Sequence, residues 1–221
     1  MNSTSRSVLR VSISEDHGIA ALSDTDKRIY SVGISTGGVA EMRMAVADPR
    51  RRIVATTIDA EGARFAQIEI EKAGLSKQIE VKIEDVARPL PYPDEYFDFI
   101  YARLVLHYLP KIELVRALRE LFRVLRLKGR LFVVVRSIEC PEAKNGALDL
   151  DTGMTTYHGT DGRAFSRYFH NEKSIQEHLG AAGFHIHAVK SYDEHLCIDF
   201  QRTQLASQVD VLIEVLASKE I

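Results

Sequence analysis

Short apolar runs alternate with amphipathic stretches along most of the chain. Apolar positions that alternate or run together, many of them β-branched, predict strands at residues 28–33, 52–59, 78–85, 96–102, 130–136, 184–190 and 209–217. Apolar positions spaced for one helix face predict helices at residues 37–47, 60–74, 112–125 and 172–180. This alternation is typical of an α/β fold, and it predicts a doubly wound, mostly parallel seven-stranded sheet with helices on both faces.

Two segments depart from this regular pattern. Residues 1–27 are mostly polar, and we expect them to form an N-terminal extension of a domain that spans residues 28–221. Within the extension, the alternation of Leu9, Val11 and Ile13 hints at a short strand. Residues 137–170 are the least regular part of the chain, and they follow the fifth strand, where an acceptor pocket or lid can form.

Composition and charge describe an ordinary globular chain of 221 residues, of which 45% are hydrophobic and 27% charged. A formal net charge of -2 gives no electrostatic reason to expect a nucleic-acid or membrane partner. Two cysteines, Cys140 and Cys197, cannot make a disulfide framework, which favours a reducing compartment. Because the sequence shows no signal-peptide pattern and no membrane-length apolar run, we expect a cytoplasmic location.

Candidate chemistry gathers at the predicted carboxyl ends of the strands, where ligands bind in sheets of this type. Glycines in the turn VGISTGG, which follows the first strand, let backbone approach a ligand and open a helix N-terminus. Asp59 ends the second predicted strand, where a carboxylate can accept both hydroxyls of a ribose. Glu84 and Asp85 end the third, where a carboxylate can accept from an adenine amino group. The structural alternatives are a turn without a ligand, a helix N-cap at Asp59 and a solvated turn at Asp85.

The stretch PLPYPDEYFDFIYARLVLHYLP resembles a motif of the class I S-adenosylmethionine-dependent methyltransferases, in particular the methyltransferase type 11 group. In that group "LPFPDxSFDxV" precedes the fourth strand and "LHHL" follows it. The segments ALRELFRVLRLKGR and YFHNEKSIQEHLGAAGF resemble two further motifs of the group. The resemblance is close over residues 28–136 and looser over residues 165–190. It implies a Rossmann-like methyltransferase fold and S-adenosyl-L-methionine as the cofactor.

The same resemblance implies which residues contact the cofactor. They lie at the ends of the first four strands: Ser31, Gly33, Ile34, Ser35, Gly37, Asp59, Ala60, Asp85, Val86, Tyr101 and Ala102. Two of them depart from the family pattern, because Ser31 stands where an acid is usual and Ser35 where a glycine is usual. A serine at position 31 keeps hydrogen bonding without the charge, and losing one charge-assisted bond weakens binding by about ten- to a hundredfold.

Residues that could take part in catalysis are harder to identify, since methyl transfer depends mainly on alignment and needs a general base only for some acceptors. Our candidates are His107 after the fourth strand, and Tyr157 and His158 in the irregular segment; Arg103 and Arg163 lie close to them in sequence. For His107 the alternative is a structural histidine at the start of a helix.

Three functions remain in competition: a methyltransferase acting on a small-molecule acceptor, a non-catalytic relative with a weakened cofactor site, and a nicotinamide dehydrogenase. The third fits poorly, because GISTGG does not match GxGxxG and no YxxxK pair is present. His185 and His187 form an HxH pair, but no further ligand stands at a recognisable spacing, so we expect no metal site. The expected partner is a small-molecule substrate, and a homodimer is possible.

Overall fold

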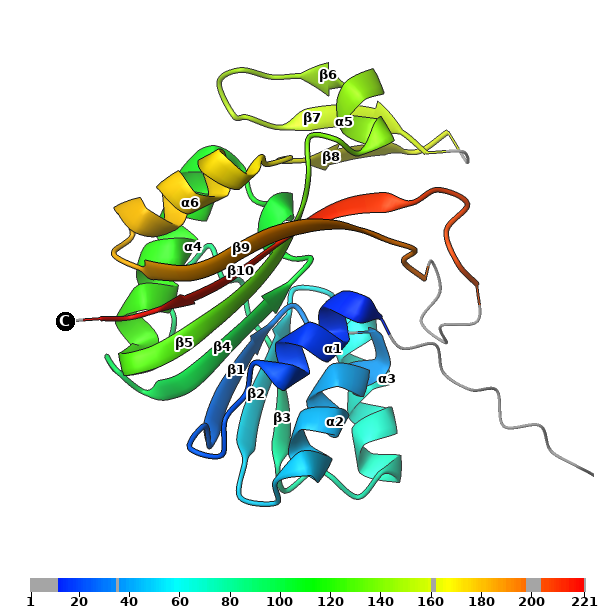
Figure 1. The fold of residues 1–221 in the computed structure, drawn as a ribbon. Coiled ribbons are helices and arrows are strands. Elements are labelled where there is room, and N and C mark those ends of the chain that lie inside the picture. Colours follow the sequence, from blue (N-terminus) through cyan, green and yellow to red (C-terminus); the bar gives the residue numbers. More distant parts are fainter. Residues whose placement is uncertain (1–11, 35, 160–161, 198–203, 221) are drawn as a thin grey trace, which may run out of the picture.

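A computed structural model describes residues 12–34, 36–159, 162–197 and 204–220 of the chain, and a seven-stranded sheet forms its centre (Figure 1). The strands lie in the order β3-β2-β1-β4-β5-β10-β9, in which the first five are parallel and β10 is antiparallel to both β5 and β9. Their bounds are β1 Arg28–Val32, β2 Arg52–Thr57, β3 Ile79–Ile83, β4 Phe97–Arg103, β5 Leu125–Arg136, β9 His185–Glu194 and β10 Asp210–Ser218. The predicted doubly wound, mostly parallel sheet is confirmed.

Helices cover both faces of this sheet (Figure 1). One face packs against α1 (Ile13–Ala20), α2 (Val39–Ala47) and α3 (Ala60–Lys72). The other packs against α4 (Lys111–Val124) and α6 (Glu172–Ala181). Single turns of 3-10 helix, η1 (Thr36–Gly38) and η2 (Leu106–Tyr108), follow β1 and β4 and so lie at the ligand-binding edge.

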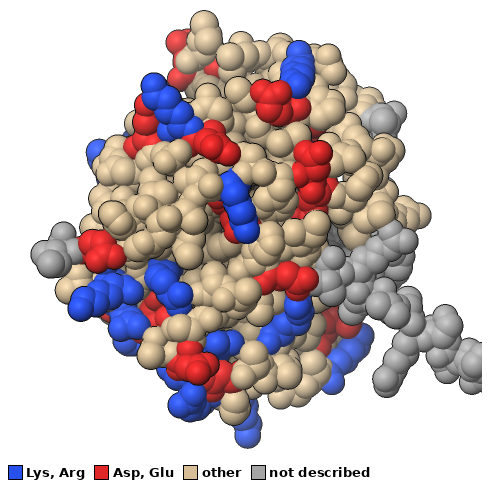
Figure 2. Space-filling model, in the orientation of Figure 1, with Lys and Arg blue, Asp and Glu red and all other residues tan. Residues whose placement is uncertain are grey.

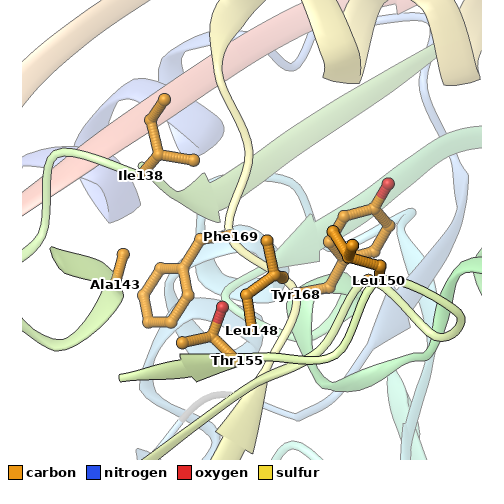
Figure 3. A pocket seen from close by; sticks show the side chains of 8 residues that line it. Ile138, Ala143, Leu148, Leu150, Thr155, Tyr168 and Phe169 are labelled. Carbon is orange, nitrogen blue, oxygen red and sulfur yellow. The ribbon is translucent and has the colours of Figure 1, made fainter. Parts of the chain in front are cut away.

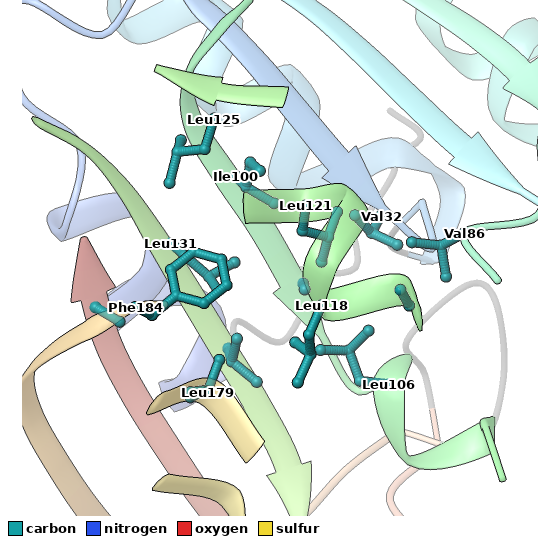
Figure 4. Packing of buried hydrophobic residues seen from close by; sticks show 14 of the residues in the cluster. Val32, Val86, Ile100, Leu106, Leu118, Leu121, Leu125, Leu131, Leu179 and Phe184 are labelled. Carbon is teal, nitrogen blue, oxygen red and sulfur yellow. The ribbon is translucent and has the colours of Figure 1, made fainter. Parts of the chain in front are cut away.

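The continuous apolar run in β5 explains how one strand serves two cores. Val133 and Val135 face the α4 and α6 side, whereas Val134 faces the side of α1 to α3, and all three are fully buried. Side chains alternate across a strand, so a strand covered on both faces needs apolar residues at every position. Figure 4 shows the first core, in which Leu118 and Leu121 of α4 pack over Ile100 and Leu131.

The segment between β5 and α6 is more regular than its sequence suggests. A short helix, α5 (Pro141–Asn145), precedes a three-stranded antiparallel sheet of β6 (Ala147–Leu148), β7 (Thr155–His158) and β8 (Ala164–Arg167). This small sheet lies beyond the end of β5, at the top of Figure 1. Strands of two to four residues are too short to give a readable period, which is why the sequence pattern missed them.

The prediction of a short strand near the N-terminus is wrong at Ile13, which instead begins α1. The Ser12 side chain caps this helix by accepting from the backbone N–H of Glu15. Leu9 and Val11 lie outside the described residues. The helix packs directly on the large sheet, with Ile19 beside the core of that face.

The surface carries charges of both signs, interspersed over the face seen in Figure 2, where much of the area is uncharged. In the described part of the chain, no helix combines the length and the apolar character needed to cross a membrane.

Candidate functional site

The turn after β1 is built on glycines with left-handed backbone. Gly33, Gly37 and Gly38 have φ values of 71°, 66° and 72°, which side chains with a Cβ rarely adopt. A Cβ on Gly33 would lie 2.7 Å from Cγ2 of Val105, so only glycine lets the end of β1 come this close to the segment after β4. The turn leads into α2, whose N-terminal N–H groups face the strand ends. Ile34 donates its N–H to Thr56 at 2.6 Å, and Ser35 lies outside the described residues.

Ser31, the position where an acid is usual, lies beside a carboxylate from another element. Its Oγ donates to Oε1 of Glu41 at 2.5 Å, and both residues are fully buried. Glu41 is the third residue of α2, so the glycine turn determines that this side chain returns toward β1. A carboxyl group is therefore present next to Ser31, although position 31 itself is a serine.

The second strand ends at Thr57, two residues before the predicted end at Asp59, which is a correction to the sequence prediction. Asp59 is instead the N-cap of α3, and its carboxylate oxygens accept from the N–H groups of Glu61 and Gly62, each at 3.1 Å. The carboxylate is exposed and keeps lone pairs for a ligand. Ile58, next to it, is 75% exposed, so apolar surface lies open beside the carboxylate.

At the end of β3 the two acids have different surroundings. Glu84 accepts hydrogen bonds from the hydroxyls of Tyr30 and, at 3.0 Å, of Tyr92. Burial and this carboxylate raise the pKa of both tyrosines above the ordinary value. Asp85 accepts from the N–H of Ala87 at 2.9 Å, lies 3.6 Å from Nε of Arg88 and is partly open to solvent, so of the two acids it is the more accessible to a ligand. Ile83 beside it is 65% exposed.

The residues that end β4 are mostly core residues. The Tyr101 ring stacks on Phe132 with centroids 5.7 Å apart and lies against Gly18 of α1, and Ala102 and Val86 are buried in the opposite core. Their side chains therefore pack internally, and any contact that they make at the strand ends comes from backbone. The Arg103 side chain turns toward α1, where its Nε donates to Oγ of Ser14 at 2.7 Å.

His107 in η2 is almost fully buried, together with a second histidine that the sequence analysis did not identify. His170 follows β8 and bridges to Ser137 at the end of β5. In the described part of the chain, neither imidazole has a hydrogen-bond partner for its nitrogens. Burial lowers the pKa of His170 to about 3, and burial with the nearby charge of Arg167 lowers the pKa of His107 well below its ordinary value. Both are therefore neutral at pH 7.

Tyr157 and His158 lie in β7 but on opposite faces, because neighbouring residues of a strand point to opposite sides. Tyr157 is buried against Phe169, whereas His158 is exposed. Arg167 links Tyr157 to the segment after β4, because its guanidinium donates to the hydroxyls of both Tyr157 and Tyr108. His158 and the exposed Arg163 are not part of this group.

Possible metal ligands meet at one place in the described chain, where Cys140, Glu142 and Asp210 have ligand atoms within 4.8 Å of one another. Arg136 forms ion pairs with both of these carboxylates, at 2.8 and 2.5 Å, so a cationic side chain already occupies the place beside them. His187 of the HxH pair bonds to Oγ of Ser218 at 2.7 Å.

The geometry of the strand ends suits a nucleoside cofactor. The glycine turn leaves room for backbone contacts, Asp59 and Asp85 present open carboxylates, and Ile58 and Ile83 add two exposed apolar side chains for a flat ring.

The sequence alone did not identify Glu41, Arg167 and His170, because their roles depend on tertiary contacts. The only sequence signal for the last two was the basic and aromatic run SRYFH.

Comparisons with known proteins give the same fold. A search of curated proteins found no match to the sequence. A solved S-adenosylmethionine-dependent methyltransferase from Methanosarcina mazei is 21% identical, with a TM-score of 0.76 over 92% of this chain and 97% of that one. The YcgJ protein of Bacillus subtilis is 16% identical, with a TM-score of 0.69 over 94% and 98%. The [4+2]-cyclase SpnF is 21% identical, with a TM-score of 0.67 over 94% and 80%.

A family model described as a methyltransferase domain matches residues 30–133, which run from β1 into β5 and include all four strand ends described above. Residues 30–133 therefore match a methyltransferase domain, and the fold that surrounds them is similar to that of the solved S-adenosylmethionine-dependent methyltransferase from Methanosarcina mazei.

Proposed function

We propose that the protein transfers a methyl group from S-adenosylmethionine to a small-molecule acceptor. The observation that carries this proposal is the glycine turn after β1, where left-handed backbone at Gly33 lies beside the open carboxylates that follow β2 and β3. The family match covers the same strand ends. The acceptor would enter from the side of the small sheet, which lies beyond the end of β5.

Individual residues have separate tasks in this proposal. Backbone of the turn at Gly33 and Gly37 holds the amino-acid part of the cofactor, and the buried carboxyl group of Glu41 supports its ammonium through Ser31. Asp59 accepts from ribose hydroxyls with the lone pairs that the helix cap leaves open, and Asp85 accepts from the adenine amino group.

When bound, S-adenosylmethionine supplies a methyl group on a positively charged sulfur, which is activated before any protein group acts. The protein's contribution is then to align the acceptor and exclude water. His107 is neutral at pH 7 and is our candidate for accepting a proton from an acceptor that must lose one, although the burial that lowers its pKa makes it a weak base. Tyr157 lies within the same set of contacts, while His158 lies on the outer face of β7 and has no such position.

A second candidate is a protein that keeps the fold without transferring a methyl group. Ser31 and Thr57 favour it, because neither the end of β1 nor the end of β2 carries the acid itself. A protein of the same fold, SpnF, is named a [4+2]-cyclase, and one fold hosts several chemistries.

Isothermal titration calorimetry separates these functions. We expect S-adenosylhomocysteine to bind and NAD not to bind. Asp59→Asn is the informative variant, because asparagine caps a helix as well as aspartate but lacks the charge. We expect this variant to bind S-adenosylhomocysteine about tenfold or more weakly, whereas His107→Ala changes its affinity little.

Absence of binding at millimolar S-adenosylhomocysteine would favour the second candidate. Equal, small effects of the two substitutions would remove Asp59 from the site, and binding of NAD alone would favour a dehydrogenase.

A further inference from the structure

A cavity of about 280 Å³ opens under the small sheet (Figure 3). Its walls are mostly carbon: Ile138, Ala143, Leu148, Leu150, Gly153, Thr155, Tyr168 and Phe169. Leu148 and Leu150 are 59% and 85% exposed, so apolar surface lies open to water at this site. Because Ile138 lies two residues beyond the carboxyl end of β5, the cavity lies at the edge of the large sheet where ligands bind. It suits the apolar part of a small molecule.

Arg167 lies beside this cavity and faces the same way. It stands directly opposite Thr155 in the pairing of β7 with β8, and residues opposite each other in an antiparallel pair share a face. Its guanidinium lies between two tyrosine rings, with the carbon 5.4 Å from each ring centroid. It donates to the hydroxyl of Tyr157 and, at 3.4 Å, to that of Tyr108. The rings hold the guanidinium in place without neutralising it.

Among the residues that the structure describes, no carboxylate forms an ion pair with Arg167, although its charge acts on the Asp210 carboxyl from a longer distance. Two other arginines with little exposed surface have an acidic partner, since Arg136 pairs with Glu142 and Asp210 and Arg103 lies 3.8 Å from Glu194, whereas the buried Arg51 donates to backbone carbonyls instead. For Arg167, by contrast, the described residues offer no carboxylate at ion-pair distance, and its Nε is buried without a hydrogen-bond partner.

Two buried histidines near Arg167 also have ring nitrogens without hydrogen-bond partners. Both ring nitrogens of His107 and of His170 lack partners within the described chain. Tyr168 connects these groups with the cavity. Its ring lines the cavity and packs at a tilt against His170, with centroids 4.4 Å apart, and its N–H donates to the carbonyl of His107 at 2.7 Å. Buried N–H donors without acceptors are rare in proteins, and each calls for a water or a ligand oxygen.

We propose that the acceptor is a small molecule with an apolar body and a carboxylate, the body filling this cavity and the carboxylate pairing with Arg167. A planar guanidinium matches a carboxylate in shape and charge. A carboxylate fits better than a phosphate, since Arg136 is already neutralised and Arg167 alone balances one negative charge. The inference rests on the proposed methyl transfer only in calling this molecule the acceptor.

The test compares matched ligands by calorimetry. The probes are 3-phenylpropanoate, 4-phenylbutanoate and the uncharged amide of each, titrated with and without S-adenosylhomocysteine. We expect the wild-type protein to bind at least one carboxylate about tenfold or more tightly than its amide, the factor typical of one charge-assisted pair. Arg167→Gln should reduce this preference to about one, and Arg167→Lys should keep part of it.

Arg116→Gln is the control, because it removes the same charge from the exposed face of α4 and should keep the preference. Ala143→Phe fills the cavity and should weaken the carboxylate and the amide together. Melting temperatures of all variants show whether they fold.

Three results would overturn the inference: no binding of either carboxylate, equal binding of carboxylate and amide, or an unchanged preference in a folded Arg167→Gln protein. The S-adenosylhomocysteine titration is independent of these results. If the carboxylate preference is found but the cofactor product does not bind, the anion site stands and methyl transfer fails. If the product binds without any carboxylate preference, only the acceptor class is wrong.

Discussion

Gly18 shows how much a single residue can determine, because it lets α1 lie directly on two aromatic rings of the sheet. A Cβ at this position would lie 2.4 Å from Cε2 of Tyr101 and 2.7 Å from Cε1 of Phe132, which are both buried. Stacked rings in a close-packed core have little room to move.

We therefore expect Gly18→Ala to lower the free energy of unfolding by about 1–3 kcal/mol, despite the better helix propensity of alanine. Gly180→Ala is the matched control, since Gly180 lies in α6 with no atom within 4 Å of a new Cβ. This control should raise stability by about 0.5–1 kcal/mol. Urea unfolding of both variants gives the comparison, and a stabilised Gly18→Ala protein would show that α1 packs less closely.

Single residues were predictable where their role is local. Asn171 stands directly before the helix predicted at residues 172–180, and its side chain accepts from the N–H of Ser174 in a capping box. The contact between Ser31 and Glu41 was not predictable, because its geometry depends on where the glycine turn lets α2 begin. Arg167 and His170 likewise gain their surroundings only from tertiary pairing.

At the scale of elements, a buried polar network fixes α1 to the edge of the sheet. Glu194, the last residue of β9, accepts from Oγ of Ser12 and, at 3.1 Å, from the N–H of Ser14. Arg103 at the end of β4 lies 3.8 Å from the same carboxylate and donates to both serine hydroxyls. Removing the charge of Glu194 leaves the charge of Arg103 buried and without its acidic partner.

We expect Glu194→Gln to lower the free energy of unfolding by about 3–5 kcal/mol, measured in urea. Glu69→Gln breaks an ion pair with Lys72 on the exposed surface of α3 and should cost less than about 1 kcal/mol. Similar values for the two variants would mean that the network does not hold α1.

Elements with a long regular pattern were predicted from sequence to within a few residues, as α3 and β10 show. The pattern failed where elements are short, as in β6, or where a helix passes directly into a strand. At Leu125 α4 changes into β5 without an intervening loop, so the strand begins five residues before its predicted start at Arg130.

For the whole molecule, the buried histidines couple folding to pH. His170 has a pKa of about 3 in the folded protein, and burial also lowers the pKa of His107. In the unfolded chain both take up protons near pH 6.5. Above pH 6.5 both histidines are neutral in the folded and in the unfolded chain, so they do not reduce the free energy of unfolding. As the pH falls from 6.5 toward 3, only the unfolded chain takes up these protons, and the folded protein loses stability.

We expect the neutral burial of His170 to lower stability by about 2 kcal/mol between pH 7 and pH 5, a range above the titration of most carboxylates, and the burial of His107 to act in the same direction. His170→Phe should remove one such contribution, so its free energy of unfolding should depend less on pH. His185→Phe, at an exposed position, should keep the wild-type dependence. Parallel pH profiles for wild type and His170→Phe would show that His170 does not stay neutral.

The architecture was predictable because strands and helices alternate regularly, and the family resemblance added the cofactor and its strand ends. The sequence could not reveal that the catalytic candidates separate, with Tyr157 inside and His158 outside. Which face of a four-residue strand turns inward depends on pairing with β6 and β8, which no local pattern encodes.

The position of β10 also affects how the chain folds during synthesis. This strand separates β5 from β9 and pairs with both, yet it is translated after either of them. A nascent chain that has not reached Asp210 therefore leaves one edge of β5 and all of β9 without their sheet partners, and open edges of this kind invite pairing with other chains. Insertion of a late strand between two earlier ones makes sheet closure a late event on the ribosome, and this is the stage at which a chaperone would protect the chain best.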